Sequence, residues 1–64
     1  MKPFLLLYID SKGNEHFGWF ENENEMRAFV KTEDVTEINE ALEIFNAREI
    51  EMKISQYQHF IKQF

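Results

Sequence analysis

The feature that most constrains the fold is an unbroken apolar run near the N-terminus, Phe4–Ile9. It follows Pro3 and ends at Asp10, and it is far shorter than the ~20 residues needed to span a membrane. We therefore expect a strand that is buried on both faces. Because alternate side chains of a strand point to opposite faces, both sides of its sheet need cover. A chain of 64 residues covers one face readily and two with difficulty, which predicts a partner.

The composition excludes several classes of protein. There is no cysteine, so disulfides and thiolate zinc sites are excluded. The net charge is −5, and residues 21–51 alone carry ten acidic side chains against three basic ones. This balance argues against direct binding to nucleic acid and to anionic membranes. The apolar run is short for a signal peptide and no small-residue cleavage site follows it, so we expect a cytoplasmic protein.

The first half of the chain predicts a hairpin and a helix. Residues 10–14 include Gly13 and favour a turn that leads into a second apolar stretch at 15–20, so two paired strands are expected. Asn22 begins a capping box and is followed by one apolar helical face, which predicts a helix over residues 23–31.

The second half predicts two more helices and a strand. Apolar residues at helical spacing from Ile38 to Phe45 favour a helix that begins near residues 34–36. Strict alternation of polar and apolar residues then predicts a strand over residues 48–54, and Ser55 begins a final amphipathic helix. The alternative is one continuous helix from residue 35 to 64, which would carry two apolar faces.

These elements give the order β-β-α-α-β-α in a single small α+β domain, residues 1–64. We expect a three-stranded antiparallel sheet in the order 2-1-3, with the two-sided apolar strand in the centre. Two helices would cover one face. The C-terminal helix would cover the other face or reach a second copy, and strand addition between two copies is equally compatible with the pattern.

The residues that carry chemistry form no recognisable site. The two histidines, His16 and His59, are far apart in the sequence and have no cysteine between them, whereas a metal needs three or four converging ligands. Each serine and threonine has a turn or cap explanation, and Gly13 and Gly18 are too few for a phosphate loop. We therefore expect no enzyme, no cofactor, no metal and no small-molecule substrate.

An aromatic surface is the first functional hypothesis. Ten aromatic side chains are many for one small core, so some are expected at an interface with another protein or, in a homodimer, with a second copy. The predicted interface residues are Trp19, Phe20, Tyr57, Phe60 and Phe64.

A line of acidic side chains is the basis of the alternative hypothesis. The predicted second helix would carry one acidic face, formed by Glu33, Glu37, Glu40 and Glu43. Such a face is typical of a solvated helix surface. It is also compatible with an inhibitor of the kind that phages encode, which blocks a nucleic-acid-processing enzyme by mimicking phosphate charge.

Overall fold

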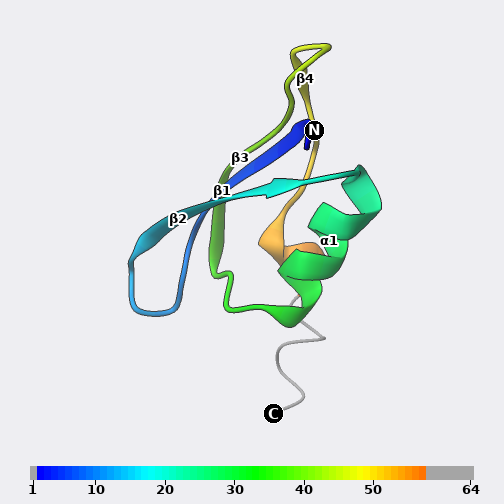
Figure 1. Ribbon diagram of the computed structural model, residues 1–64. Helices are drawn as coiled ribbons and strands as arrows, with labels where there is room; N and C mark the ends of the chain where they lie inside the picture. Colours follow the sequence, from blue (N-terminus) through cyan, green and yellow to red (C-terminus); the bar gives the residue numbers. More distant parts are fainter. Residues whose placement is uncertain (1, 58–64) are drawn as a thin grey trace.

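The computed structural model describes residues 2–57, which form a four-stranded antiparallel sheet with one α-helix on one of its faces (Figure 1). The spatial order of the strands is β2-β1-β3-β4. The elements in chain order are β1 (Phe4–Ile9), β2 (Glu15–Phe20), α1 (Glu23–Thr32), β3 (Glu37–Glu43), β4 (Arg48–Glu49) and the short 3-10 helix η1 (Ile54–Gln56). None of the helices in this part of the chain has the length and apolar character that a membrane crossing requires.

The hairpin of β1 and β2 confirms the prediction of two paired strands at residues 4–9 and 15–20. The two strands pair without interruption from Phe4 opposite Phe20 to Ile9 opposite Glu15. The turn between them is organised by the Asp10 carboxylate, which accepts hydrogen bonds from the backbone N–H groups of residues 12 and 14, both at 2.9 Å. Gly13 has a φ of +83°, a conformation that glycine adopts without steric cost.

Helix α1 confirms the prediction of a helix over residues 23–31, and it covers one face of the sheet. The Asn22 side chain accepts a 2.8 Å hydrogen bond from the backbone N–H of Glu25, which satisfies an otherwise unpaired donor of the first turn. Met26 and Val30, one turn apart, are fully buried. The helix ends at Thr32, and the backbone N–H and hydroxyl of Thr36 then bond to the Ile9 carbonyl, at 2.8 and 3.0 Å.

The prediction of a helix from residues 34–36 to 46 is wrong, because this segment forms β3. The strand pairs with β1, and its register shifts so that Leu7 lies opposite Glu40 whereas Tyr8 lies opposite Ile38. Asn39 is therefore an extra residue, as in a β-bulge. The bulge places Ile38 and Ala41, which are three positions apart in the sequence, on the same side of the strand. Apolar residues three positions apart are also typical of a helix, which is why the sequence pattern predicted one.

The prediction of a strand over residues 48–54 is also wrong in its extent. Only Arg48 and Glu49 pair with β3, as β4. The N–H of Ile50 still donates to the Ala41 carbonyl, at 2.8 Å, and the chain then leaves the sheet and reaches η1. Of the predicted C-terminal helix, residues 58–64 lie outside the described residues. The expected three-stranded sheet with several helices is replaced by four strands and one α-helix in the described part of the chain.

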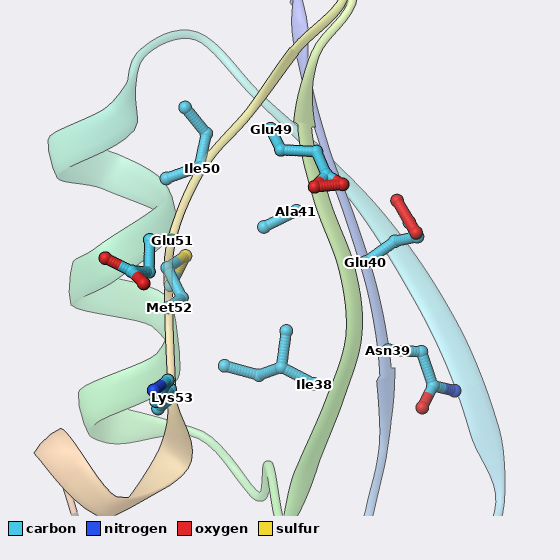
Figure 2. Close-up of a pocket in the computed structure, with 9 residues that line it drawn as sticks. All are labelled: Ile38, Asn39, Glu40, Ala41, Glu49, Ile50, Glu51, Met52 and Lys53. Carbon is cyan, nitrogen blue, oxygen red and sulfur yellow. The ribbon is translucent and has the colours of Figure 1, made fainter.

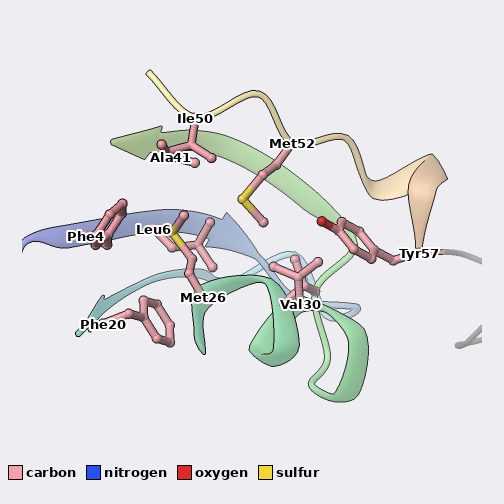
Figure 3. Close-up of a cluster of buried hydrophobic side chains, with 10 residues drawn as sticks. Phe4, Leu6, Phe20, Met26, Val30, Ala41, Ile50, Met52 and Tyr57 are labelled. Carbon is pink, nitrogen blue, oxygen red and sulfur yellow. The ribbon is translucent and has the colours of Figure 1, made fainter. Parts of the chain in front are cut away.

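The hydrophobic core lies between the sheet, α1 and the segment that follows β4 (Figure 3). Arg27 of α1 fixes this segment: its guanidinium donates to the Tyr57 hydroxyl at 2.9 Å and to the Glu51 carbonyl at 3.3 Å. The buried apolar side chains are Phe4, Leu6, Phe20, Met26, Val30, Val35, Ala41, Ile50, Met52 and Tyr57.

Candidate functional site: the open face of the sheet

The second face of the sheet carries large apolar side chains that no described segment covers. Helix α1 and the segment after β4 both lie on the opposite side (Figure 1). Alternation along the strands and their register define this open face as Leu5, Leu7, Ile9, Glu15, Phe17, Trp19, Glu37, Glu40 and Leu42. The sequence predicts that both faces of the sheet around Phe4–Ile9 need cover. Within residues 2–57 only one side of β1 is in the core, and the other side is open.

One half of the open face is apolar. Leu5 lies between Trp19 on β2 and Leu42 on β3, and Leu7 has Phe17 as its neighbour on β2. Phe17 is 69% exposed and Trp19 is 46% exposed, whereas their neighbours on β1 are half-buried. Aromatic side chains exposed in this way carry a large apolar area that remains in contact with water.

The other half of the open face is acidic. Ile9 lies between Glu15 on β2 and Glu37 on β3, and Glu40 lies opposite Leu7. The apolar centre of the face is therefore bordered by carboxylates at the end where the β1–β2 turn lies. No basic residue belongs to the face as defined above.

A shallow hollow adjoins the apolar end of the open face. It has a volume of about 530 Å³ and is lined by Lys2, Pro3, Trp19, Ile44 and Phe45. Ile44 and Phe45 lie in the turn between β3 and β4 and are themselves 43% and 65% exposed. Lys2 and Glu21, the residue that follows β2, bring charges of opposite sign to this end of the sheet.

The predicted interface residues do not lie on one surface. Trp19 lies on the open face, but Phe20 and Tyr57 are buried in the core, at 7% and 5% exposure. Phe60 and Phe64 lie outside the described residues. The predicted set omits Phe17 of the open face, although its position two residues before Trp19 places both on one side of a strand.

The predicted acidic face is also divided by the structure. Because β3 replaces the helix, Glu37 and Glu40 lie on the open face while Glu43 lies on the side of α1. There Glu43 accepts a 2.9 Å hydrogen bond from Arg48, and hydrogen bonds from Asn46 and Arg48 lower its pKa. Glu33 is the C-cap of α1. The four carboxylates therefore do not form a single line.

A second hollow lies at the edge of β3, where β4 ends (Figure 2). Ile38 and Ala41 point into the space between β3 and residues 49–53, and Glu40 points away from it. Its volume is about 180 Å³, below the ~300 Å³ typical of small-molecule pockets. Its apolar residues belong to the core or pack against it, so the hollow is a shallow part of the core boundary.

The polar clusters have structural roles. His16 forms a hydrogen bond with Asp10, whereas the Ser11 hydroxyl donates to Asp34 at 2.7 Å. The serine hydroxyl is thus bonded to a carboxylate and not to the histidine that could act as its base. Asp34 also accepts from the backbone N–H of Ser11, which ties the loop after α1 to the β1–β2 turn. Among residues 2–57 no three metal-ligating side chains of His, Cys, Asp or Glu converge.

Comparison of the chain with models of protein families, with curated proteins and with solved structures finds no match. The open face, with its apolar and acidic halves, is therefore the feature from which a function is assigned.

Proposed function

We propose that this chain is a non-enzymatic protein-interaction module that associates with a second copy of itself through the open face. The observation that carries the proposal is the exposure of Phe17 and Trp19, at 69% and 46%, beside Leu5 and Leu7 on the uncovered side of the sheet. Transfer of such a side chain from water to an apolar environment contributes about 1.5–3 kcal/mol. Aromatic residues are also enriched among the residues that dominate binding energies.

A second sheet is the partner whose shape fits the open face best. Two sheets pack face to face when each presents an apolar side, and the side chains of the two layers then interdigitate. The face spans only three strands of six or seven residues, about 20 Å in length at ~3.3 Å per residue. Interfaces this small are typical of reversible association, so we expect a dimer that dissociates on dilution.

The alternative, an acidic inhibitor of a nucleic-acid-processing enzyme, has less support. Only Glu37 and Glu40 of its four carboxylates share the open face, and Glu43 is paired with Arg48. This alternative requires a complex with a basic protein that weakens steeply as salt is added. For either role we propose the cytoplasm as the compartment, with which a chain without cysteine is compatible.

The test is the mass of the protein in solution from low micromolar to millimolar concentration, by sedimentation equilibrium. We expect a monomer–dimer equilibrium for the natural chain and a monomer for Phe17→Ser, with unchanged circular dichroism. Ala28→Ser is the control, because Ala28 is exposed on α1, which covers the opposite face of the sheet. A natural chain that is monomeric throughout, or a Phe17→Ser variant that associates as tightly as the natural chain, would overturn the proposal.

A further inference from the structure

The outer edge of β2 presents backbone groups that no strand of residues 2–57 pairs with. The strand lies at one side of the sheet and pairs with β1. The backbone N–H of Asp10 bonds to the Asn14 carbonyl at 3.0 Å, and pairs that exchange backbone hydrogen bonds alternate along an antiparallel ladder from there. The even-numbered residues of β2 therefore bond to β1. The backbone N–H and C=O groups that point outwards belong to the odd-numbered residues, Glu15, Phe17 and Trp19.

The strand β2 lacks the features that usually protect an edge from a further strand. Natural edges carry proline, lysine or a bulge, or are very short. This strand has six residues, contains neither proline nor lysine, and pairs with β1 in an unshifted register. The outer strand on the other side of the sheet, β4, is only two residues long. An extended segment beside β2 would therefore find a regular row of backbone donors and acceptors.

The side chains along this edge define the kind of segment that fits it. Phe17 and Trp19 lie in the middle and are exposed, at 69% and 46%. An exposed glutamate stands at each end, because Glu15 begins β2 and Glu21 follows it. The turn before the strand adds one lysine, Lys12. The edge is thus apolar in its centre and has a carboxylate at each end.

A second copy of β2 matches this pattern less well than a basic segment does. Antiparallel pairing centred on Phe17 places Glu15 diagonal to the partner's Glu21, and pairing centred on Gly18 places the same two glutamates directly opposite each other. A register centred on His16 pairs only three residues of each strand. Each copy also has a net charge of −5, so the edges of two copies repel each other at long range.

We propose that β2 binds, as an added strand of the sheet, an extended segment of another protein that is apolar in its centre and has a lysine or arginine at each end. The two basic residues are six positions apart, the separation of Glu15 and Glu21 in the sequence. Backbone hydrogen bonds supply affinity, and the charged ends select the segment and its register. This site goes beyond the open-face association, because it uses the backbone of one strand edge.

Amide hydrogen exchange, measured by NMR, tests the proposal. The probe is the acetylated and amidated heptapeptide Lys-Thr-Val-Thr-Val-Thr-Lys. When it pairs antiparallel with β2, its lysines lie opposite Glu15 and Glu21 and its valines opposite Phe17 and Trp19. In the chain alone, the amides of residues 15, 17 and 19 should exchange fast and those of residues 16, 18 and 20 slowly. With about two thirds of the copies occupied by the peptide, the outward amides should exchange about threefold more slowly.

Two controls separate strand pairing from attraction between charges. The same peptide N-methylated at both valines keeps its charges but loses two backbone donors that face β2, and it should give no protection. Glu15→Gln and Glu21→Gln should each weaken binding of the unmodified peptide by up to about fivefold. Glu51→Gln is the matched variant, because Glu51 is exposed in the segment after β4, and it should leave binding unchanged.

Three results would overturn the added strand. The outward amides of β2 could remain fast at millimolar peptide, or both peptides could protect them equally. They could also exchange slowly without peptide, which would show that a second copy or another part of the same chain occupies the edge. The open-face association is measured by the mass in solution, so it stands or fails independently of these results.

Discussion

The Nε2 atom of His16 lies 2.7 Å from the Oδ2 atom of Asp10, at the point where β2 begins. The imidazole ring also stacks on Tyr8, with ring centroids 5.2 Å apart. The hydrogen bond from His16, followed by those from the Asn14 and Lys12 backbone, lowers the pKa of Asp10 from 3.8 to about 2. The ionised carboxylate of Asp10 therefore stabilises the turn between β1 and β2 by accepting these hydrogen bonds.

The stability of the hairpin should depend on the ionisation of Asp10. Because its pKa is lower in the folded chain, the stabilisation is fully present above pH 3.8 and is lost as the pH falls through about 2. An NMR titration of the Asp10 carboxyl group measures this directly. Asp10→Asn keeps an oxygen that accepts the backbone hydrogen bonds but removes the charge, so its free energy of unfolding should change less with pH in this range. An Asp10 titration at the ordinary value would contradict the prediction.

Ala47 offers a stabilising substitution. It has a φ of +50° in the turn between β3 and β4, a left-handed conformation that is unfavourable for residues with a Cβ atom. Ala47→Gly should raise the free energy of unfolding by up to about 1 kcal/mol, measured by urea denaturation. Ala28→Gly is the matched control, because the same change within α1 should lower it by about 0.5–1 kcal/mol. A decrease in both variants would show that the turn tolerates Ala47 without strain.

The hydrogen bonds from Arg27 should slow the local opening of the segment after β4. Tyr57→Phe removes one hydrogen bond to its guanidinium, at an expected cost of about 1.5–3 kcal/mol for a charged donor. The amides of residues 50–57 should then exchange with solvent faster, which hydrogen-exchange mass spectrometry detects. Ser11→Ala, which removes an exposed hydrogen bond to Asp34, should cost at most about 1.5 kcal/mol and leave those amides unchanged. Equal effects of the two variants would mean that Arg27 has no special role.

The elements that the sequence predicts correctly are those specified by neighbouring residues. The turn at Asp10 and Gly13 and the cap at Asn22 place the hairpin and α1 within one residue of their observed limits. The strand β3 is not specified in this way. Its bulge at Asn39 separates Ile38 from Ala41 by three positions, and only pairing with β1 distinguishes that pattern from a helix.

The site was partly predictable for the same reason. The apolar run of β1 predicts apolar side chains on both faces of the sheet, and alternation on β2 assigns Phe17 and Trp19 to the same side. The burial of Phe20 and Tyr57 depends on where α1 and the segment after β4 pack, which follows from contacts distant in the sequence. The separation of Glu43 from Glu40 likewise depends on β3 being a strand.

The central position of β1 has a consequence for synthesis on the ribosome. The chain emerges from its N-terminus, so β1 and β2 are available first and form a hairpin whose second edge has no partner. That edge remains without backbone hydrogen bonds until β3, which follows α1 in the sequence, has also emerged. Until α1 has emerged as well, the nascent hairpin exposes apolar side chains on both faces of β1, and such a surface is open to capture by a chaperone.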